Sequence, residues 1–211
     1  AVYTEALFAA LAIWFFVCAK QKQWGRASLI GALAAATRLP GVFLVFPLFY
    51  YVWQTRAHWF NYAWGGVIAL GTGAYLAAQY WYTGHALAFL TAQKHWGRVF
   101  GHFNPDHLYW VTRAGMANSS IDILWGIALV TSIVWIGKKL DWGYALYAAA
   151  IVLIPLTSGS LLSLARFGMV LFPIALVFAK SKPQWQTTYI VVASILLAFY
   201  TTQFVNGYWA G

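Results

Sequence analysis

The sequence predicts an all-α protein, a polytopic transmembrane helix bundle with about eight membrane segments. Hydrophobic residues make up 62% of the 211-residue chain and charged residues only 8%, whereas a soluble domain carries about a quarter charged residues. The apolar segments are long and continuous and do not alternate every second residue, which indicates helices and not barrel strands. The 13 Trp and 13 Tyr residues suit aromatic belts at two membrane interfaces.

The apolar segments follow one another along the whole chain and are separated by polar stretches. In chain order they cover residues 6–19, 27–53, 61–82, 121–137, 144–156, 164–179 and 185–204. No repeat, low-complexity tract or linker divides the chain. We therefore expect a single membrane domain over residues 1–211.

The second segment is interrupted by Thr37-Arg38-Leu39-Pro40-Gly41, and Pro and Gly together end a helix. Its first arm, residues 27–37, would be about 17 Å long, which is short of the roughly 30 Å hydrocarbon core. The segment is therefore either one kinked crossing or a short hairpin of two arms. The hairpin supplies two of the predicted membrane segments.

The distribution of Lys and Arg favours the hairpin, because it divides the cations most unevenly between the two sides of the membrane. On the predicted cytoplasmic side lie Lys20, Lys22, Arg26, Arg56, Lys138, Lys139, Lys180 and Lys182. On the other side lie Arg38, Lys94, Arg98, Arg113 and Arg166. Since these cations are scattered between apolar segments, we expect membrane lipids and not nucleic acid as partners.

Residues 83–120 form the one long polar interruption, which we expect to be an extracytoplasmic loop over an active site. The loop carries four of the five histidines, His85, His95, His102 and His107. Wound as a helix, residues 85–98 place polar and basic side chains on one face and apolar ones on the other. An interfacial helix without chemistry would show the same periodicity.

Arg38 and Arg166 stand at the ends of apolar segments, on the side that is poorer in cations. A cation against the membrane is costly and needs a partner, and a planar guanidinium matches phosphate oxygens. We therefore expect a shared site for an anionic lipid head group, with Lys94 and Arg98 beside it. The alternative is that each arginine reaches ordinary phospholipid phosphate.

Glu5 is the only glutamate of the chain and lies on the same predicted side as Arg38 and Arg166. It could be a general base, a metal ligand or an ion-pair partner, and the last is the ordinary role. Asp141 follows two lysines and is typical of a solvated turn.

We expect no metal ion and no cofactor. The histidine spacing lacks the patterns of zinc sites, although His102, Asp106 and His107 could form an alternative metal site. No P-loop, GxSxG or helix-opening GxGxxG occurs. The glycines of Gly65-Gly66 and Gly71-Thr72-Gly73 fall inside a predicted helix, where they would permit close helix packing.

Five short motifs occur along the chain in the order YTEALFAALA, GALAAATRLPG, FLTAQKHWGR, SLLSLARFGMVLFP and NGYW. Their order resembles the PIG-V family, which supplies the second mannosyltransferase of GPI-anchor assembly and has bacterial and archaeal relatives. That family belongs to the GT-C class of polytopic glycosyltransferases.

The resemblance implies a mannosyltransferase whose donor is a sugar linked to polyprenyl or dolichyl phosphate. Transfer to a lipid or glycan acceptor would occur on the non-cytoplasmic face, with inversion and without a nucleotide sugar. It favours a multi-pass protein of a bacterial or archaeal plasma membrane over one of the endoplasmic reticulum. Within the motifs, the expected donor-binding residues are Tyr3, Arg38, Gln93, Lys94, His95, Arg98 and Arg166.

This chemistry needs a carboxylate base for the acceptor hydroxyl and cations for the departing phosphate. GT-C enzymes usually carry the acidic residue in the first outward loop. The chain begins in mid-pattern, so we expect a truncated member whose base lies upstream, with Glu5 as the remaining candidate. Two alternatives are an anionic-lipid transporter or flippase-like carrier and a non-catalytic membrane subunit.

Overall fold

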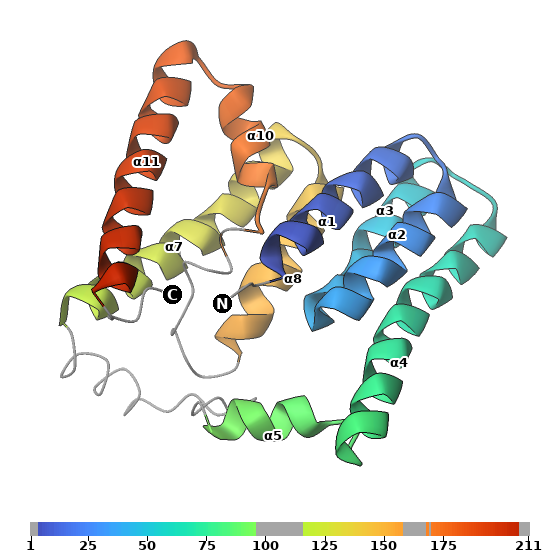
Figure 1. The fold of residues 1–211 in the computed structure, drawn as a ribbon. Helices are drawn as coiled ribbons and strands as arrows, with labels where there is room; N and C mark the ends of the chain where they lie inside the picture. Colours follow the sequence, from blue (N-terminus) through green and yellow to red (C-terminus); the bar gives the residue numbers. More distant parts are fainter. Residues whose placement is uncertain (1–3, 96–115, 158–167, 169, 207–211) are drawn as a thin grey trace.

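A computed structural model describes residues 4–95, 116–157, 168 and 170–206 of the chain. In this part the predicted all-α fold is confirmed (Figure 1). In chain order the helices are α1 (Glu5–Lys20), α2 (Trp24–Thr37), the 3₁₀ helix η1 (Leu39–Leu44), α3 (Val45–Gln54), the 3₁₀ helix η2 (Trp59–Ala63), α4 (Trp64–Thr83), α5 (Ala88–His95), α7 (Met116–Lys139), α8 (Trp142–Leu156), α10 (Pro173–Ala179) and α11 (Pro183–Val205).

The prediction of a transmembrane bundle with about eight membrane segments is wrong. Among the described residues, no helix combines the length and the hydropathy that a membrane crossing requires. Several helices are short, with 16 residues in α1, 14 in α2 and 10 in α3. At 1.5 Å per residue even α1 reaches only about 24 Å. Helix α4 has 20 residues, but its glycines and polar residues lower its hydropathy.

The chain reverses direction at the predicted break, although α2 and α3 are too short for the predicted membrane hairpin. Helix α2 starts close to Lys20, at the end of α1, and Tyr51 near the end of α3 has its ring 6.0 Å from the Lys20 Nζ atom. The start of α2 and the end of α3 therefore lie at the same end of the bundle. Helix α2 stops because Pro40 follows, and Arg38 has an extended backbone with φ −151° and ψ 138°.

Helices α2 and α4 lie side by side and run in the same direction (Figure 1). A Cβ atom on Gly71 would lie 2.0 Å from the carbonyl oxygen of Ala32, so glycine lets the two backbones meet. A Cβ on Gly65 would meet the Phe49 ring at 2.5 Å. Close packing is therefore confirmed for these two glycines. It is wrong for Gly66 and Gly73, where an added Cβ would meet nothing within 4 Å.

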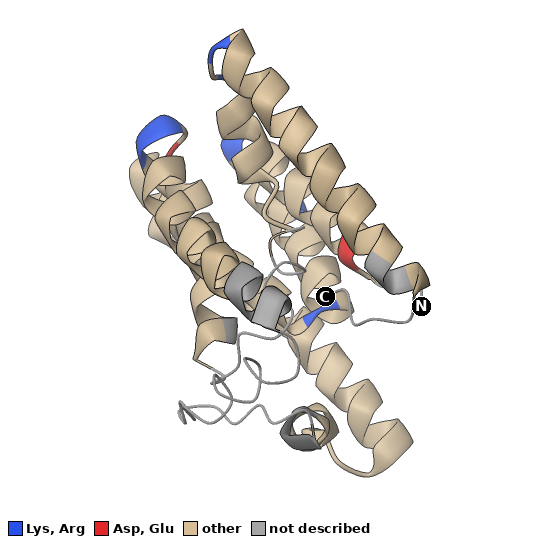
Figure 2. Ribbon diagram, turned by 90° about the vertical axis from the view of Figure 1, so that its left-hand side faces the viewer, with Lys and Arg blue, Asp and Glu red and all other residues tan. Residues whose placement is uncertain are grey.

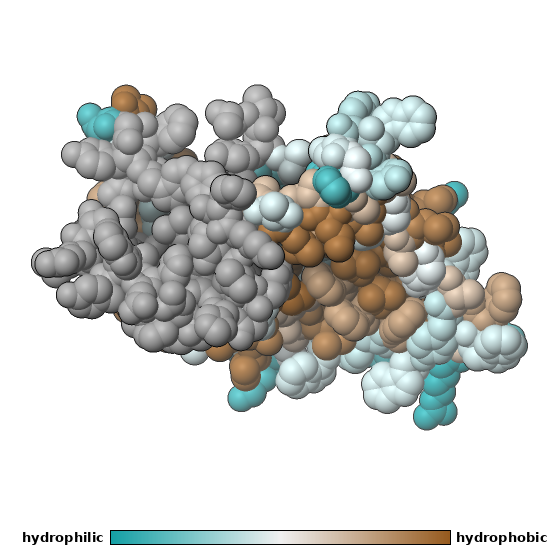
Figure 3. Space-filling view, turned by 90° about the horizontal axis from the view of Figure 1, so that it is seen from below, coloured by the Kyte–Doolittle hydropathy of each residue, from teal (hydrophilic) through white to brown (hydrophobic). Residues whose placement is uncertain are grey.

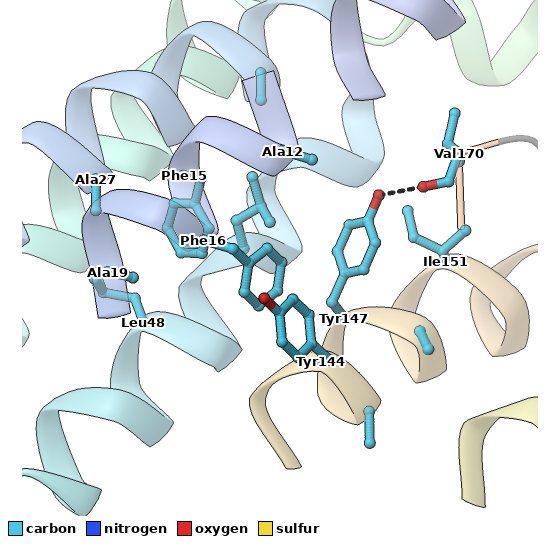
Figure 4. Close-up of a cluster of buried hydrophobic side chains, with 14 of the residues drawn as sticks. Ala12, Phe15, Phe16, Ala19, Ala27, Leu48, Tyr144, Tyr147, Ile151 and Val170 are labelled. Carbon is cyan, nitrogen blue, oxygen red and sulfur yellow. Dashed lines mark hydrogen bonds between the residues drawn. The ribbon is translucent and has the colours of Figure 1, made fainter. Parts of the chain in front are cut away.

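The core is centred on Phe16 of α1, which is 1% exposed (Figure 4). Its ring stacks on Tyr144 with the centroids 4.4 Å apart, and the Tyr147 and Phe172 rings each lie 5.6 Å away. Such aromatic pairs add about 0.5–1.5 kcal/mol to the free energy of area burial. Through this one side chain, α1 packs on α8 and on the residue before α10.

Most described Lys and Arg residues gather at one end of the bundle, towards the top of Figure 2. We call it the basic end, and it comprises the turns that carry Lys20, Lys22, Arg26, Arg56, Lys138, Lys139, Lys180 and Lys182. Arg38 lies at the opposite end, beside Glu5, which we call the Glu5 end. The nine cations that were predicted on two sides of a membrane lie at the two ends of the bundle, and the two sides of a membrane stay a prediction.

Candidate anion-binding site

The backbone of Arg38 is fixed where α2 ends. Its N–H donates to the Ala34 carbonyl oxygen at 3.1 Å, and its own carbonyl accepts from the Gly41 N–H at 2.9 Å. A Cβ on Gly41 would lie 2.4 Å from the Ala35 backbone nitrogen. Because Gly41 has no Cβ, η1 can fold back onto the last turn of α2 and hold Arg38 in one place.

The Arg38 side chain forms an ion pair with Glu5, with 2.7 Å between Nη1 and Oε1. The two side chains are only 18% and 10% exposed, respectively. Glu5 lies in the first turn of α1, where the helix dipole favours a carboxylate. The ordinary role considered for Glu5, an ion-pair partner, is therefore the one seen in the structure.

The positive charge of Arg38 also acts electrostatically on the phenol of Tyr147 in α8. Burial raises the pKa of Tyr147, and attraction to Arg38 acts in the opposite direction. The Tyr147 hydroxyl donates to the carbonyl oxygen of Val170 at 2.8 Å (Figure 4). Val170 belongs to the motif that contains Arg166, so this bond joins the described end of that motif to α8.

Helix α5 lies at the Glu5 end, beside the lower end of α4 in Figure 1. Helix α4 ends at Gly84, which turns the chain with φ 74°, and the Phe89 ring of α5 lies 6.1 Å from the Tyr75 ring of α4. The predicted helix over residues 85–98 is thus present as Ala88–His95. The backbone of Gln93, Lys94 and His95 is at the same end as Arg38, while the structure does not describe their side chains.

Three of the predicted site residues, Tyr3, Arg98 and Arg166, lie outside the described residues. The convergence of Arg38, Arg98 and Arg166 therefore stays a prediction. Within the part of the chain that the structure covers, no three His, Cys, Asp or Glu side chains lie together as a metal site would need. The alternative metal ligands His102, Asp106 and His107 lie outside that part.

A second polar cluster, at the basic end, was missed from the sequence. Asp141 forms an ion pair with Lys20 at 2.7 Å, and its other oxygen accepts from the Tyr51 hydroxyl at 2.7 Å and the Tyr144 N–H at 3.2 Å. Its side chain is 18% exposed, so the interpretation as a solvated turn is wrong. The available signal was its place directly before α8, where Asp is favoured as an N-cap.

The ionisation of this cluster follows from its contacts. Burial and the hydrogen bond to Asp141 raise the pKa of Tyr51, and burial also raises the pKa of Tyr144. Burial alone would lower the pKa of Lys20, but its bond to Asp141 and the neighbouring Tyr144 raise it. The Lys20 ammonium lies 4.4 Å from the centre of the Tyr144 ring. The cluster therefore keeps Lys20 charged and both phenols neutral at physiological pH.

Comparisons of the chain with protein-family models, with curated proteins and with solved structures found no match. The resemblance to the PIG-V family therefore stays a prediction.

Proposed function

We propose that this protein is a glycosyltransferase, a mannosyltransferase whose donor is a sugar linked to polyprenyl or dolichyl phosphate. The observation that carries the proposal is the Glu5–Arg38 ion pair. Glu5 belongs to the first of the five motifs and Arg38 to the second. The pair therefore joins two motifs at one end of the bundle and holds a guanidinium there.

Arg38 would bind the phosphate of the donor. A guanidinium has five N–H donors in a rigid fork, so its single 2.7 Å bond to Glu5 is compatible with further bonds to phosphate oxygens. As the acceptor hydroxyl attacks the anomeric carbon, the bond from that carbon to the phosphate oxygen breaks and negative charge grows on the phosphate. A fixed arginine stabilises this charge more in the transition state than in the ground state.

Glu5 would position Arg38 and not act as the base. Its carboxylate is engaged by the guanidinium at 2.7 Å and is 10% exposed, so an acceptor hydroxyl has little access to it. A general base must come within hydrogen-bond reach of the proton that it accepts. We assign the base to no described residue.

The exposed surface suits a lipid-linked donor. Large apolar side chains stand out from α2 and α4, among them Leu33 at 58% and Leu70 at 70% exposure. Figure 3 shows hydrophobic residues exposed on the face that is seen from the Glu5 end. Soluble monomers rarely expose large contiguous apolar patches. We propose that the protein works at a bacterial or archaeal plasma membrane, with the carrier chain against this surface.

The test measures donor binding and sugar transfer with the same protein. The chain is incubated with polyprenyl phosphate mannose labelled in the sugar, and the products are separated by polarity. We expect Arg38→Gln to lose donor binding and transfer, and Arg38→Lys to keep the ion pair but lose most transfer, since lysine lacks the fork. The matched control is Arg56→Gln at the basic end, which should change neither.

The alternatives give different products. An anionic-lipid transporter or flippase-like carrier would move the donor between the leaflets of a vesicle and leave the label on the lipid phosphate. A non-catalytic subunit would not bind the donor by itself. Wild-type protein that binds the donor and never releases the sugar from its phosphate would contradict the proposed transfer.

A further inference from the structure

A groove of about 400 Å³ runs between the outer faces of α1 and α2 at the basic end. Its apolar walls are Trp14 and Val17 of α1 and Leu29 and Ile30 of α2. Trp14 and Leu29 are each 59% exposed, so these walls have no covering element in the part of the chain that the structure describes. The volume lies within the roughly 300–1,000 Å³ range of small-molecule sites.

The groove is polar at one end only. Arg26 Nη1 donates to Gln23 Oε1 at 3.1 Å, and Gln23 Nε2 donates to Gln21 Oε1 at 3.0 Å. These three side chains line the end of the groove that faces the basic end. The guanidinium of Arg26 and the side-chain amides of the two glutamines therefore lie together at this end of the groove. The cavity thus offers an apolar slot that finishes in cationic hydrogen-bond donors.

We propose that this groove binds an anionic phospholipid, with one acyl chain along Trp14 and Leu29 and the phosphate at Arg26. The occupant follows from charge complementarity, because an apolar slot with a guanidinium at its mouth matches a chain joined to a phosphate. Lys22, between the lining residues Gln21 and Gln23, adds to the attraction for an anionic head group. The site lies at the opposite end from Arg38 and is independent of the donor site.

Cys18 provides a reporter inside the site. It lines the groove, is 7% exposed, and is the only cysteine of the chain. A lipid chain in the groove would cover its thiol, so slower alkylation in the presence of the lipid is the expected sign of occupancy. No engineered cysteine is needed in the wild-type protein.

The experiment uses short-chain phosphatidylglycerol and phosphatidylcholine with identical acyl chains, each below its critical micelle concentration. Binding is followed by calorimetry, and Cys18 alkylation by a small maleimide is followed by mass spectrometry. We expect phosphatidylglycerol to bind roughly fivefold more tightly than phosphatidylcholine, since one cation near a head group is worth that ratio. It should slow Cys18 alkylation by a similar factor.

Matched variants separate the groove from general surface charge. Arg26→Gln should remove the preference for phosphatidylglycerol and Arg26→Lys should keep part of it. Arg56→Gln, which removes an exposed cation of the same end outside the groove, should keep all of it. Trp14→Ala should weaken both lipids alike. Circular dichroism on each variant confirms that the helices are retained.

Several results would overturn the proposal. Equal affinity for the two lipids would show that the groove has no site for the anionic head group. Lipid binding without protection of Cys18 would show that the lipid binds elsewhere. Equal binding of glycerol phosphate would show that the chain contributes nothing. Protection of Cys18 that grows with protein concentration in the absence of lipid would identify the groove as a contact between two copies of the chain.

Discussion

Each end of α1 is held by an ion pair of 2.7 Å, Glu5 with Arg38 at one end and Lys20 with Asp141 at the other. The two pairs differ in exposure, because the Lys20 side chain is 44% exposed and the Glu5 side chain only 10%. An exposed pair contributes about 0–1 kcal/mol, whereas removing one partner of a buried pair leaves an uncompensated charge. The Glu5 end is therefore the more sensitive to substitution.

Glu5→Gln and Arg38→Gln are each expected to lower the free energy of unfolding by about 1.5–3 kcal/mol, the usual contribution of a hydrogen bond to a charged group. The double variant should lose less than the sum of the two, because the second substitution removes the charge that the first left unpaired. Urea unfolding of the four proteins measures this coupling. Strictly additive losses would show that the two side chains do not stabilise one another.

Because of Tyr51, the free energy of unfolding should depend on pH in the alkaline range. The pKa of Tyr51 is raised in the folded state, while in the unfolded chain it titrates near 10.0, so stability falls as pH rises above about 10. The raised pKa of Lys20 acts in the same direction, since its contribution is lost as pH passes its folded pKa, above 10.5. Tyr51→Phe should cost about 1 kcal/mol at neutral pH through the lost bond to Asp141.

Above pH 10 the decline of stability should be shallower in Tyr51→Phe than in the wild type. Unfolding free energies measured from neutral to alkaline pH check this expectation. Tyr82→Phe is the control, because Tyr82 is 85% exposed and its removal should leave the curve unchanged. A Tyr51→Phe curve parallel to the wild type would contradict the proposed role of this phenol.

At the scale of helices, the contact between α2 and α4 depends on single glycines. A Cβ on Gly71 would lie 2.0 Å from a backbone oxygen of α2, which cannot rotate away. Gly71→Ala should therefore force the helices apart and cost about 1–3 kcal/mol or more. Gly73→Ala, on the open side of the same helix, should stabilise the protein by about 0.5–1 kcal/mol. Thermal unfolding of both variants measures the difference, and shifts of the same sign would refute it.

The sequence predicted the parts of this fold whose causes are local. Pro40 and Gly41 predicted the break after α2, and the cations predicted the reversal that puts α3 beside the end of α1. Hydropathy did not predict the helix lengths. Apolar residues continue through the 3₁₀ turn Leu39–Leu44, so the apolar run does not show where a helix ends. The apolar runs therefore predicted crossings that none of the described helices has the length and hydropathy to make.

The candidate site was only partly predictable for the same reason. Arg38 stood out because a cation at the end of an apolar segment is costly, and Glu5 because it is the only glutamate. The cluster around Asp141 was not predicted, since Tyr51 and Asp141 are 90 positions apart. A contact between such distant residues depends on the packing of α3 on α8, which no local pattern encodes.

At the scale of the whole molecule, the chain has a formal net charge of +9. Of the nine Lys and Arg residues whose side chains the structure describes, eight lie at the basic end. We expect the protein to bind vesicles that contain phosphatidylglycerol and to leave them as salt rises. The triple variant Lys138→Gln, Lys139→Gln and Lys182→Gln, outside the groove, should weaken binding by about 1 kcal/mol per residue. Cosedimentation with vesicles measures this, and equal binding to pure phosphatidylcholine vesicles would contradict it.

The aromatic contacts of Phe16 also suggest that the protein can assemble from two separate pieces of the chain. Phe16 comes early in the sequence, while Tyr144, Tyr147 and Phe172 come late, and these rings meet in one core. Two separately translated pieces, cut between residues 95 and 116, should therefore reassemble when they are expressed in one cell. Phe16→Ala in the first piece should abolish their copurification, whereas Trp14→Ala, at an exposed position of the same helix, should not. A split form of this kind would make assembly of the protein, and with it any activity, dependent on the presence of both pieces.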